Sequence, residues 1–234
     1  FHLMETLGRI QILQGRPEKA HPLLLESTDG FTRMLSGDHI YTRRSQLSLA
    51  ECLLVMGQIE QAGELAGLVR SAVFLSKGAD HPDVLNADVL LARVLDAQQR
   101  PDESEDLLRS TIARQERVHG VDHPITLRTL ARLSALCARQ EHLIESIELT
   151  RRALKGLEAF ADHQHPLHWS LRDQLIDSLE RLGRGEEAAE VAREGRRRIQ
   201  MMARDADPAV RASAARFLSL YPRLATGSED SLPG

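Results

Sequence analysis

The chain repeats itself every 42 residues, and this period constrains its fold more than any other feature. Histidine recurs at that spacing at His39, His81, His123 and His165, with proline next in the last three, and one further step reaches Asp207-Pro208. A fixed period of about 20–50 residues is typical of arrays in which each repeat is too small to bury its apolar face alone. The period therefore predicts a stack of similar repeats.

Positions separated by 42 residues also keep their residue type. One register column is leucine throughout: Leu7, Leu49, Leu91, Leu133 and Leu175. A second column is small throughout: Ala20, Ala62, Ser104, Ser146 and Ala188. Turn-like residues, mostly glycine, occupy a third: Gly15, Gly57, Gln99, Glu141 and Gly183. Small residues at fixed positions let two helices approach closely while aliphatic side chains fill the space around them.

Each repeat is predicted to form two helices, because its apolar residues recur at helical spacing and proline follows histidine where a first turn tolerates it. First helices are expected at about 1–14, 39–56, 81–98, 123–140 and 165–182, and second helices at about 17–35, 59–77, 101–119, 143–161 and 185–203. The predicted fold class is all-α: an α-solenoid of antiparallel helix pairs over residues 1–220, with repeats at about 1–38, 39–80, 81–122, 123–164 and 165–206. We expect a covering helix at 207–220 and a disordered tail at 221–234.

These features together resemble the tetratricopeptide repeat. Each two-helix unit has small residues and leucines at fixed positions. A Gly-x-Asp-His-Pro segment, such as Gly120–Pro124, lies between units, and this segment together with the 42-residue period is similar to the kinesin-light-chain type of that repeat. The resemblance implies a tetratricopeptide-like superhelix that binds proteins or peptides in a concave groove. It also implies that bacterial arrays of this type are often appended to signalling proteins such as serine/threonine kinases.

Composition narrows the function classes. The chain has 234 residues and a formal net charge of −4, which gives no general basis for binding nucleic acid or anionic lipid. No apolar stretch approaches the about 18–20 residues of a membrane helix, and two cysteines cannot build a disulfide framework, so we expect a cytoplasmic protein. Only three of its 30 basic residues are lysines, a skew typical of a GC-rich bacterial genome. Because it begins with Phe1, we expect a piece of a longer polypeptide.

Histidines are the first candidates for metal binding. The histidine column is too widely spaced for one ion, whose ligands lie within about 2 Å of it, so we expect these residues to order the turns between repeats. The alternative is a local site made by His163, His165 and His168, with Asp162 or Asp173 as a further ligand. Because His165 belongs to the repeat column, we predict no metal and no cofactor.

Cysteines and arginines are the next candidates. Cys52 and Cys137 lie among apolar residues of predicted first helices, which favours buried, inert thiols. Glu194 precedes Arg198 by four residues, a spacing typical of a salt-bridged outer face, within the basic run Arg193, Arg196, Arg197, Arg198 and Arg204. No phosphate-binding loop, nucleophile elbow or zinc-protease motif occurs. We therefore predict no enzyme activity in this segment and no nucleic-acid partner.

The register predicts which residues face a ligand, because first helices line the concave side in stacks of this type. The predicted peptide-binding groove comprises Arg44, Leu47, Asn86, Val89, Arg93, Arg128, Ala131, Ala135, Asp173 and Asp177, in columns that also contain Arg9, Glu51 and Ser170. Arginines suit carboxylates, and the apolar residues suit an aliphatic or aromatic anchor. We expect a protein or peptide ligand with acidic residues beside a hydrophobic one, and any basic part near Asp173 and Asp177. The alternative is a self-association module that drives homo-oligomerisation of its parent protein.

Overall fold

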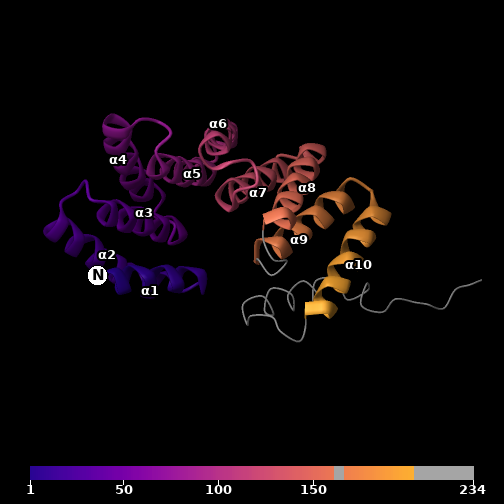
Figure 1. The fold of residues 1–234 in the computed structure, drawn as a ribbon, viewed down its shortest axis with the longest axis horizontal. Helices are drawn as coiled ribbons and strands as arrows, with labels where there is room; N and C mark the ends of the chain where they lie inside the picture. The colour runs from indigo at the N-terminus through magenta and orange to yellow at the C-terminus, as the bar shows by residue number, and fades with distance from the viewer. Residues whose placement is uncertain (161–165, 203–234) are drawn as a thin grey trace, which may run out of the picture. The chain divides into compact units, whose positions relative to one another are not determined.

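The computed structural model describes residues 1–160 and 166–202. These two ranges contain α-helices and no strand, which confirms the predicted all-α fold: α1 (His2–Leu13), α2 (Pro17–Leu35), α3 (Ile40–Val55), α4 (Ile59–Lys77), α5 (Pro82–Ala97), α6 (Pro101–His119), α7 (Pro124–Arg139), α8 (Leu143–Phe160), α9 (Pro166–Arg181) and α10 (Gly185–Met202) (Figure 1). No described helix is both long and apolar enough to cross a membrane. The expected covering helix at 207–220, the tail at 221–234 and the candidate ligands Asp162, His163 and His165 lie outside the described residues.

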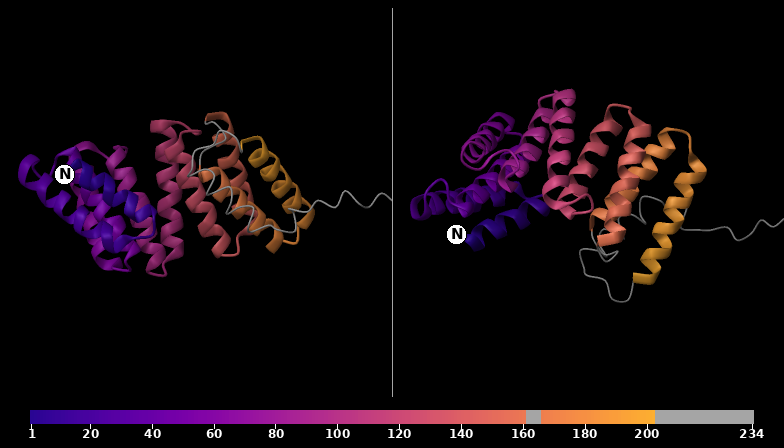
Figure 2. Two further views of the ribbon diagram at one scale, coloured as in Figure 1. Left: turned by 90° about the horizontal axis from the view of Figure 1, so that it is seen from below. Right: turned by 45° about the horizontal axis from the view of Figure 1, so that its top comes forward.

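The helices belong to two compact units, Phe1–Val118 and His119–Gly234. In the first unit each helix from α1 to α5 packs on the next along the chain, and the Ser104 hydroxyl of α6 donates to the Ala92 carbonyl of α5 at 2.7 Å. In the second unit α7, α8, α9 and α10 pack in the same sequential way (Figure 2). First helices of successive repeats are also neighbours, α1 with α3, α3 with α5, and α7 with α9. This is the helix-pair stacking that the 42-residue period predicts.

His39, His81 and His123 each cap a first helix. The Nδ1 atom of each accepts a hydrogen bond from the backbone N–H two residues later, at 3.3, 3.1 and 3.2 Å respectively. A cap of this kind satisfies an N–H group that the first helical turn leaves unpaired. Proline occupies the first helical position of α5 and α7, where its missing N–H has no cost. The histidine column therefore orders the turns between repeats at these three positions, as predicted.

Each first helix ends at the turn column of the repeat. The residues in this column all have a positive φ: Gly15 (69°), Gly57 (78°), Gln99 (61°), Glu141 (65°) and Gly183 (78°). Glycine adopts this left-handed conformation without steric cost, whereas glutamine and glutamate do not. The same turn geometry is thus kept even where the residue is not glycine.

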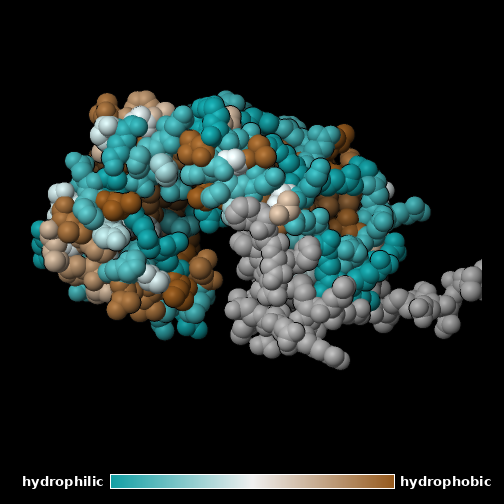
Figure 3. Space-filling model, viewed as in Figure 1, coloured by the Kyte–Doolittle hydropathy of each residue, from teal (hydrophilic) through white to brown (hydrophobic). Residues whose placement is uncertain are grey.

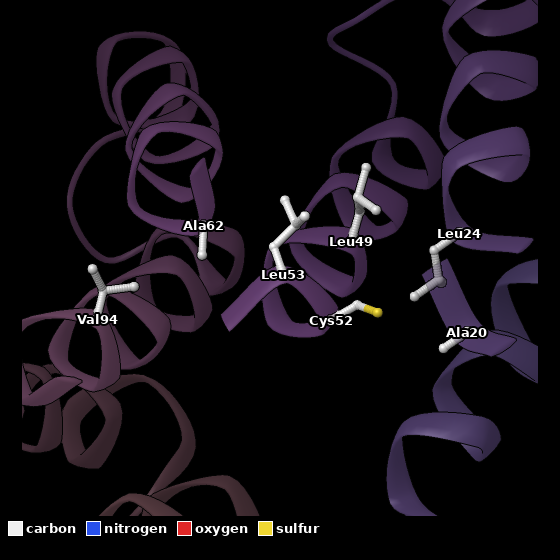
Figure 4. Packing of buried hydrophobic residues seen from close by; sticks show 7 residues of the cluster. All are labelled: Ala20, Leu24, Leu49, Cys52, Leu53, Ala62 and Val94. Atoms are coloured by element: carbon white, nitrogen blue, oxygen red, sulfur yellow. The ribbon is translucent and has the colours of Figure 1, made fainter. Parts of the chain in front are cut away.

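The small-residue column lies at the helix crossings. Its members are at most 2% exposed: Ala20, Ala62, Ser104, Ser146 and Ala188. Figure 4 shows one part of the core, in which short and aliphatic side chains of α2, α3, α4 and α5 converge: Ala20, Leu24, Leu49, Cys52, Leu53, Ala62 and Val94. Because the side chains at the crossings are short, neighbouring helices approach closely and the larger residues interdigitate around them.

Candidate peptide-binding face

The predicted groove residues all lie on first helices, and we call the surface that they form in each unit the first-helix face. In the unit Phe1–Val118 this face comprises Arg44, Leu47, Glu51, Asn86, Val89 and Arg93 on α3 and α5. In the unit His119–Gly234 it comprises Arg128, Ala131, Ala135, Ser170, Asp173 and Asp177 on α7 and α9.

One register column of this face points away from the core in both units. Asn86, Arg128 and Ser170 are exposed, and the Arg44 side chain is 42% exposed. Each of these residues lies on a helix whose other faces carry buried core residues. This column is therefore available for contacts with a ligand.

The neighbouring apolar column contributes more to the core than to the surface. Leu47 is half-buried and packs against core residues that include Ala50 and Val73. Val89 is also half-buried, and Ala131 is buried. These side chains offer a ligand only a partly exposed apolar strip.

Arg44 of the first unit already has a carboxylate partner. Its guanidinium donates to Glu5 of α1, at 3.1 Å from Nε and 2.9 Å from a terminal nitrogen. Glu5 is only 1% exposed, and the Ser48 hydroxyl also donates to it at 3.3 Å, with an Arg9 nitrogen 3.8 Å away. Taking a carboxylate out of water is costly unless it is paired and hydrogen-bonded, so Arg44 supports a buried charge and joins α3 to α1.

Arg93 is paired in the same way, one repeat further along. Its guanidinium donates to Glu51 of α3 at 2.5 Å, and the side chains are 26% and 38% exposed. Glu51 and Arg93 occupy the same register column, 42 residues apart. Two of the three predicted groove arginines thus link neighbouring first helices, and neither pair follows from the predicted register.

The second unit presents a different charge pattern. Arg128 of α7 is exposed and makes no ion pair that we find in the described part of the chain. Ala135 is half-buried, and Asp177 of α9 is 60% exposed with an oxygen 3.3 Å from Arg181. Arg181 also binds Glu141 at 2.8 Å, and its hydrogen bonds to Glu141 and Asp177 raise the pKa of its guanidinium. Arg128 is therefore the arginine of this face best placed to receive an acidic ligand.

The first unit also contains a buried ion triad that the sequence pattern does not predict. Asp88 of α5 is 0% exposed, and its two oxygens accept hydrogen bonds from Arg70 of α4 and Arg114 of α6, each at 2.5 Å. Arg114 also donates to the Ala79 carbonyl at 3.1 Å. The sequence feature that could have indicated the triad is Asp88 itself, a single aspartate among apolar residues in the interior of the predicted helix 81–98. The triad joins three helices and holds the unit together rather than forming a site.

The candidate metal ligand His168 has a structural role. It is 1% exposed, and its Nδ1 accepts a hydrogen bond from Arg172 at 3.3 Å. Arg172 lines a cavity of about 560 Å³ between α8, α9 and α10, where burial and the nearby Arg198 lower the pKa of its guanidinium to about 10. Glu158 lies 3.7 Å from Arg172 and 2.9 Å from Arg198, so one carboxylate serves both cations.

The described part of the basic run lies on α10, and two of its arginines are salt-bridged, Arg197 and Arg198. Arg198 donates to Glu194 at 2.8 Å, the pair that the spacing predicted, and this hydrogen bond lowers the pKa of Glu194. Arg197 lies 3.9 Å from the same carboxylate. Arg204 lies outside the described residues. The C-terminal charges of this helix, Glu194, Arg197 and Arg198, thus pair with one another.

Comparison with known proteins now identifies the repeat. Residues 76–159 match the model of the tetratricopeptide repeat family. This segment carries the tetratricopeptide repeat. A search of the curated proteins found no match to the chain. The matched segment contains α5, α6, α7 and nearly all of α8, so the family signal falls on the central repeats of the predicted array.

Solved structures show the same fold. The nearly identical TPR-like repeats described as a kinesin light chain from Podosopora anserina align with a TM-score of 0.63 and 22% identity, covering 92% of this chain and 95% of that one. The Rap conjugation gene regulator of the plasmid pLS20, in complex with the Phr* peptide, aligns with a TM-score of 0.72 and 15% identity over 95% of this chain and 58% of that one. A Rap protein complexed with competence and sporulation factor gives 0.72 and 11% over 95% and 64%. The predicted tetratricopeptide fold is confirmed.

Proposed function

We propose that this tetratricopeptide-repeat protein is a non-catalytic scaffold whose protein or peptide ligand lies along the first-helix face. The observation that carries the proposal is the column Arg44, Asn86, Arg128 and Ser170, whose members are exposed or half-exposed on helices that bury their other sides. Side chains repeated on one side of stacked helices form the extended binding surfaces of repeat proteins. Two structural neighbours with this fold were solved with a bound peptide or factor, which supports the same use here.

The side chains favour an acidic ligand with an apolar anchor. Arg128 offers an exposed guanidinium, and the Glu51 partner of Arg93 is 38% exposed, so a ligand carboxylate can replace it there. Arginine binds carboxylates with two parallel hydrogen bonds, which gives such a contact direction as well as energy. Val89 in the first unit and Ala135 in the second are each half-buried, and each suits an aliphatic or aromatic side chain of a ligand. A basic residue of the ligand would lie near Asp173 and Asp177.

The cellular setting that we propose is the cytoplasm of a bacterium, with the array serving a larger signalling protein such as a serine/threonine kinase. Two observations support it: arginine greatly outnumbers lysine in the chain, and one structural neighbour is a regulator of conjugation genes. The chemistry of the parent protein would then lie in another domain, and the array would select its partner.

Affinity capture followed by measured peptide binding tests the proposal. Proteins retained by the purified chain are identified by mass spectrometry, and overlapping peptides of each are titrated by fluorescence anisotropy. Arg128→Glu should weaken the best peptide at least tenfold, because the substitution places a carboxylate against an acidic ligand. The control is Lys155→Glu, which reverses an exposed charge on the second helix α8. Equal affinity for wild type and Arg128→Glu, if Asn86→Ala also has no effect, would refute the first-helix face as the binding surface.

Self-association is the alternative function, and it makes a different prediction. A chain that oligomerises through its repeats should show a mass that rises with concentration in sedimentation equilibrium, without added ligand. A ligand-binding scaffold should sediment as a monomer and gain mass only with its partner.

A further inference from the structure

The second unit contains a charged cavity that the proposed function does not use. It lies between α8, α9 and α10 and has a volume of about 560 Å³, which is within the range of small-ligand sites. Five arginines, four glutamates and one valine line it, so its cations outnumber its anions by one. Figure 3 shows hydrophilic residues gathered over α10, on the right of the molecule. The described residues that line the cavity include no member of the first-helix face, so it is a separate candidate site.

The register shows that two of these arginines replace a pair of opposite charges. Arg172 of α9 occupies the position of Asp88, and Arg198 of α10 occupies that of Arg114, in each case 84 residues further along the chain. In the first unit Arg114 donates to Asp88, so a cation binds an anion. At the same positions the second unit has two cations, and the carboxylate near both is Glu158 of α8. The second unit thus lacks the buried negative charge that Asp88 supplies at the equivalent position.

Arg172 is the less compensated of the two cations. Its side chain is 6% exposed, yet its hydrogen bonds go to His168 Nδ1 and the Val191 carbonyl, both at 3.3 Å, and neither acceptor is an anion. The closest carboxylate oxygen among the described residues belongs to Glu158, 3.7 Å from Arg172 but 2.9 Å from Arg198. Burial and the charge of Arg198 together lower the pKa of Arg172 to about 10. A nearly buried guanidinium without a close anion is costly, so an anion that enters the cavity gains a strong partner.

We propose that the cavity binds a phosphate group through Arg172 and Arg198. A phosphate monoester carries about −1.5 to −2 charges at pH 7 and three acceptor oxygens, so one group can accept hydrogen bonds from both guanidiniums. A ligand carboxylate has a single charge and would only take the place of Glu158. Glu158 is 37% exposed and can turn towards water when phosphate enters, which leaves both arginines paired. The ligand chemistry is that of a phosphate dianion, either free or attached to a side chain of a partner.

Isothermal titration calorimetry of the full chain with inorganic phosphate tests this site. The titration is run at about pH 8, where the dianion predominates, against sodium chloride of the same ionic strength. We expect saturable binding that weakens about tenfold or more in Arg172→Met and in Arg198→Gln, because each variant loses a charge-assisted hydrogen bond to the ligand. The matched control is Arg196→Gln, which removes the same charge from α10 at a residue that does not line the cavity.

Glu158→Gln distinguishes a ligand site from a purely structural cluster of charges. It removes the carboxylate that competes with phosphate for Arg172 and Arg198, so phosphate should bind more tightly than in wild type. If these charges only stabilise the fold, the substitution leaves phosphate binding unchanged or weakens it. Trp169 is 1% exposed in the second unit, so its fluorescence shows whether each variant is folded. If Arg172→Met does not fold, Arg198→Gln and Glu158→Gln still decide between the two outcomes.

Two probes separate the sources of the phosphate. Inorganic phosphate is compared with N-acetyl-O-phosphoserine amide, and the unphosphorylated N-acetylserine amide is the negative control. Tighter binding of the phosphoserine probe identifies a phosphorylated partner, whereas equal or weaker binding identifies free phosphate.

The proposal fails if wild type shows no saturable binding of either phosphate probe. Equal affinities in wild type and Arg198→Gln would also overturn it, as would binding that is no tighter in Glu158→Gln. Peptide binding at the first-helix face should be unchanged in Arg198→Gln, so failure here leaves the proposed function separately testable.

Discussion

Replacing Asp88 by alanine should destabilise the first unit far more than removing an ordinary surface ion pair. Asp88 is fully buried and accepts hydrogen bonds from both Arg70 and Arg114 at 2.5 Å. The two arginines differ in their access to water, because the Arg70 side chain is 35% exposed and the Arg114 side chain only 14%. Loss of the carboxylate therefore leaves Arg114 as a poorly compensated, nearly buried charge.

The magnitude follows from these exposures. Removing one partner of a buried ion pair costs about 3–5 kcal/mol, mainly because the remaining charge stays desolvated. The low end applies here, since Arg70 can turn towards water and Arg114 keeps its hydrogen bond to the Ala79 carbonyl at 3.1 Å. Alanine also has a higher helix propensity than aspartate, which returns roughly 0.5 kcal/mol. We expect a net loss of about 2–3 kcal/mol in the free energy of unfolding.

Urea unfolding followed by far-UV circular dichroism measures this loss. The control is Glu51→Ala, which removes the half-exposed partner of Arg93 and should cost about 0–1 kcal/mol. The lone tryptophan, Trp169, is 1% exposed in the second unit, so its fluorescence follows that unit separately. An all-apolar triple variant, Arg70→Ile with Asp88→Leu and Arg114→Leu, should recover most of the stability. A loss for Asp88→Ala no greater than for Glu51→Ala, or a triple variant no better than Asp88→Ala, would refute the reasoning.

Three further outcomes check the packing and the buried groups. Ala62→Leu should cost about 1–3 kcal/mol in urea unfolding by overpacking a helix crossing, whereas Ala72→Leu on the exposed side of α4 should have little effect. Burial raises the pKa of the Cys52 thiol to about 11, so iodoacetamide at about pH 8 should label it at least tenfold more slowly in the native chain than in urea, as peptide mapping by mass spectrometry would show. Burial and the neighbouring His119 lower the pKa of His123, so folding favours its neutral imidazole. The contribution of His123 to the free energy of unfolding is therefore complete above the ordinary pKa of 6.5, and it is lost as the pH falls below 6.5 and through the lowered pKa of the folded state. The melting temperature should therefore drop between about pH 7 and 5, and less so in His123→Asn; equal slopes would contradict this assignment.

The helices themselves were predictable because their ends carry strong local signals. The expected segments 59–77 and 101–119 match α4 and α6 residue for residue, and the first helices agree within one or two residues at each end. Proline or a histidine cap starts a helix for reasons confined to one turn, and a turn residue ends it for reasons equally local. Because these signals recur every 42 residues, the helix ends of one repeat predict those of the next.

The charge partners on the candidate face were not predictable from the register. Glu5 and Arg44 lie 39 residues apart, whereas Glu51 and Arg93 lie 42 apart, so a single offset does not describe which charges meet. Long arginine side chains reach several neighbours, and which carboxylate they bind depends on the rotation and separation of two helices. The register correctly indicated that Asn86 and Arg128 are exposed, but only the structure shows that Arg44 and Arg93 bind carboxylates already. Asp88 escaped for the same reason, since its partners come from two other helices.

The turn column supplies a prediction in which two opposing effects can be compared. Gln99 has a φ of 61°, and a side chain in this left-handed region costs about 1–2 kcal/mol. Glycine removes that cost but adds freedom to the unfolded chain, which opposes folding by about 0.5–1 kcal/mol. The steric cost is the larger, so Gln99→Gly should stabilise the protein by about 0.5–1 kcal/mol.

Gly57 provides the reverse substitution at the equivalent position of the preceding repeat. Its φ is 78°, and a Cβ built there meets no other atom within 4 Å, so only the backbone conformation determines the effect. Gly57→Gln should therefore destabilise by a similar amount, about 0.5–1 kcal/mol, in the same urea experiment. Gln99 is the better site than Glu141, because Glu141 also binds Arg181 at 2.8 Å and its loss would mix two effects. The two substitutions should shift the urea midpoint of unfolding in opposite directions. A shift in the same direction would show that left-handed backbone strain does not determine the difference between glycine and glutamine in this column, and that contacts of the glutamine side chain contribute instead.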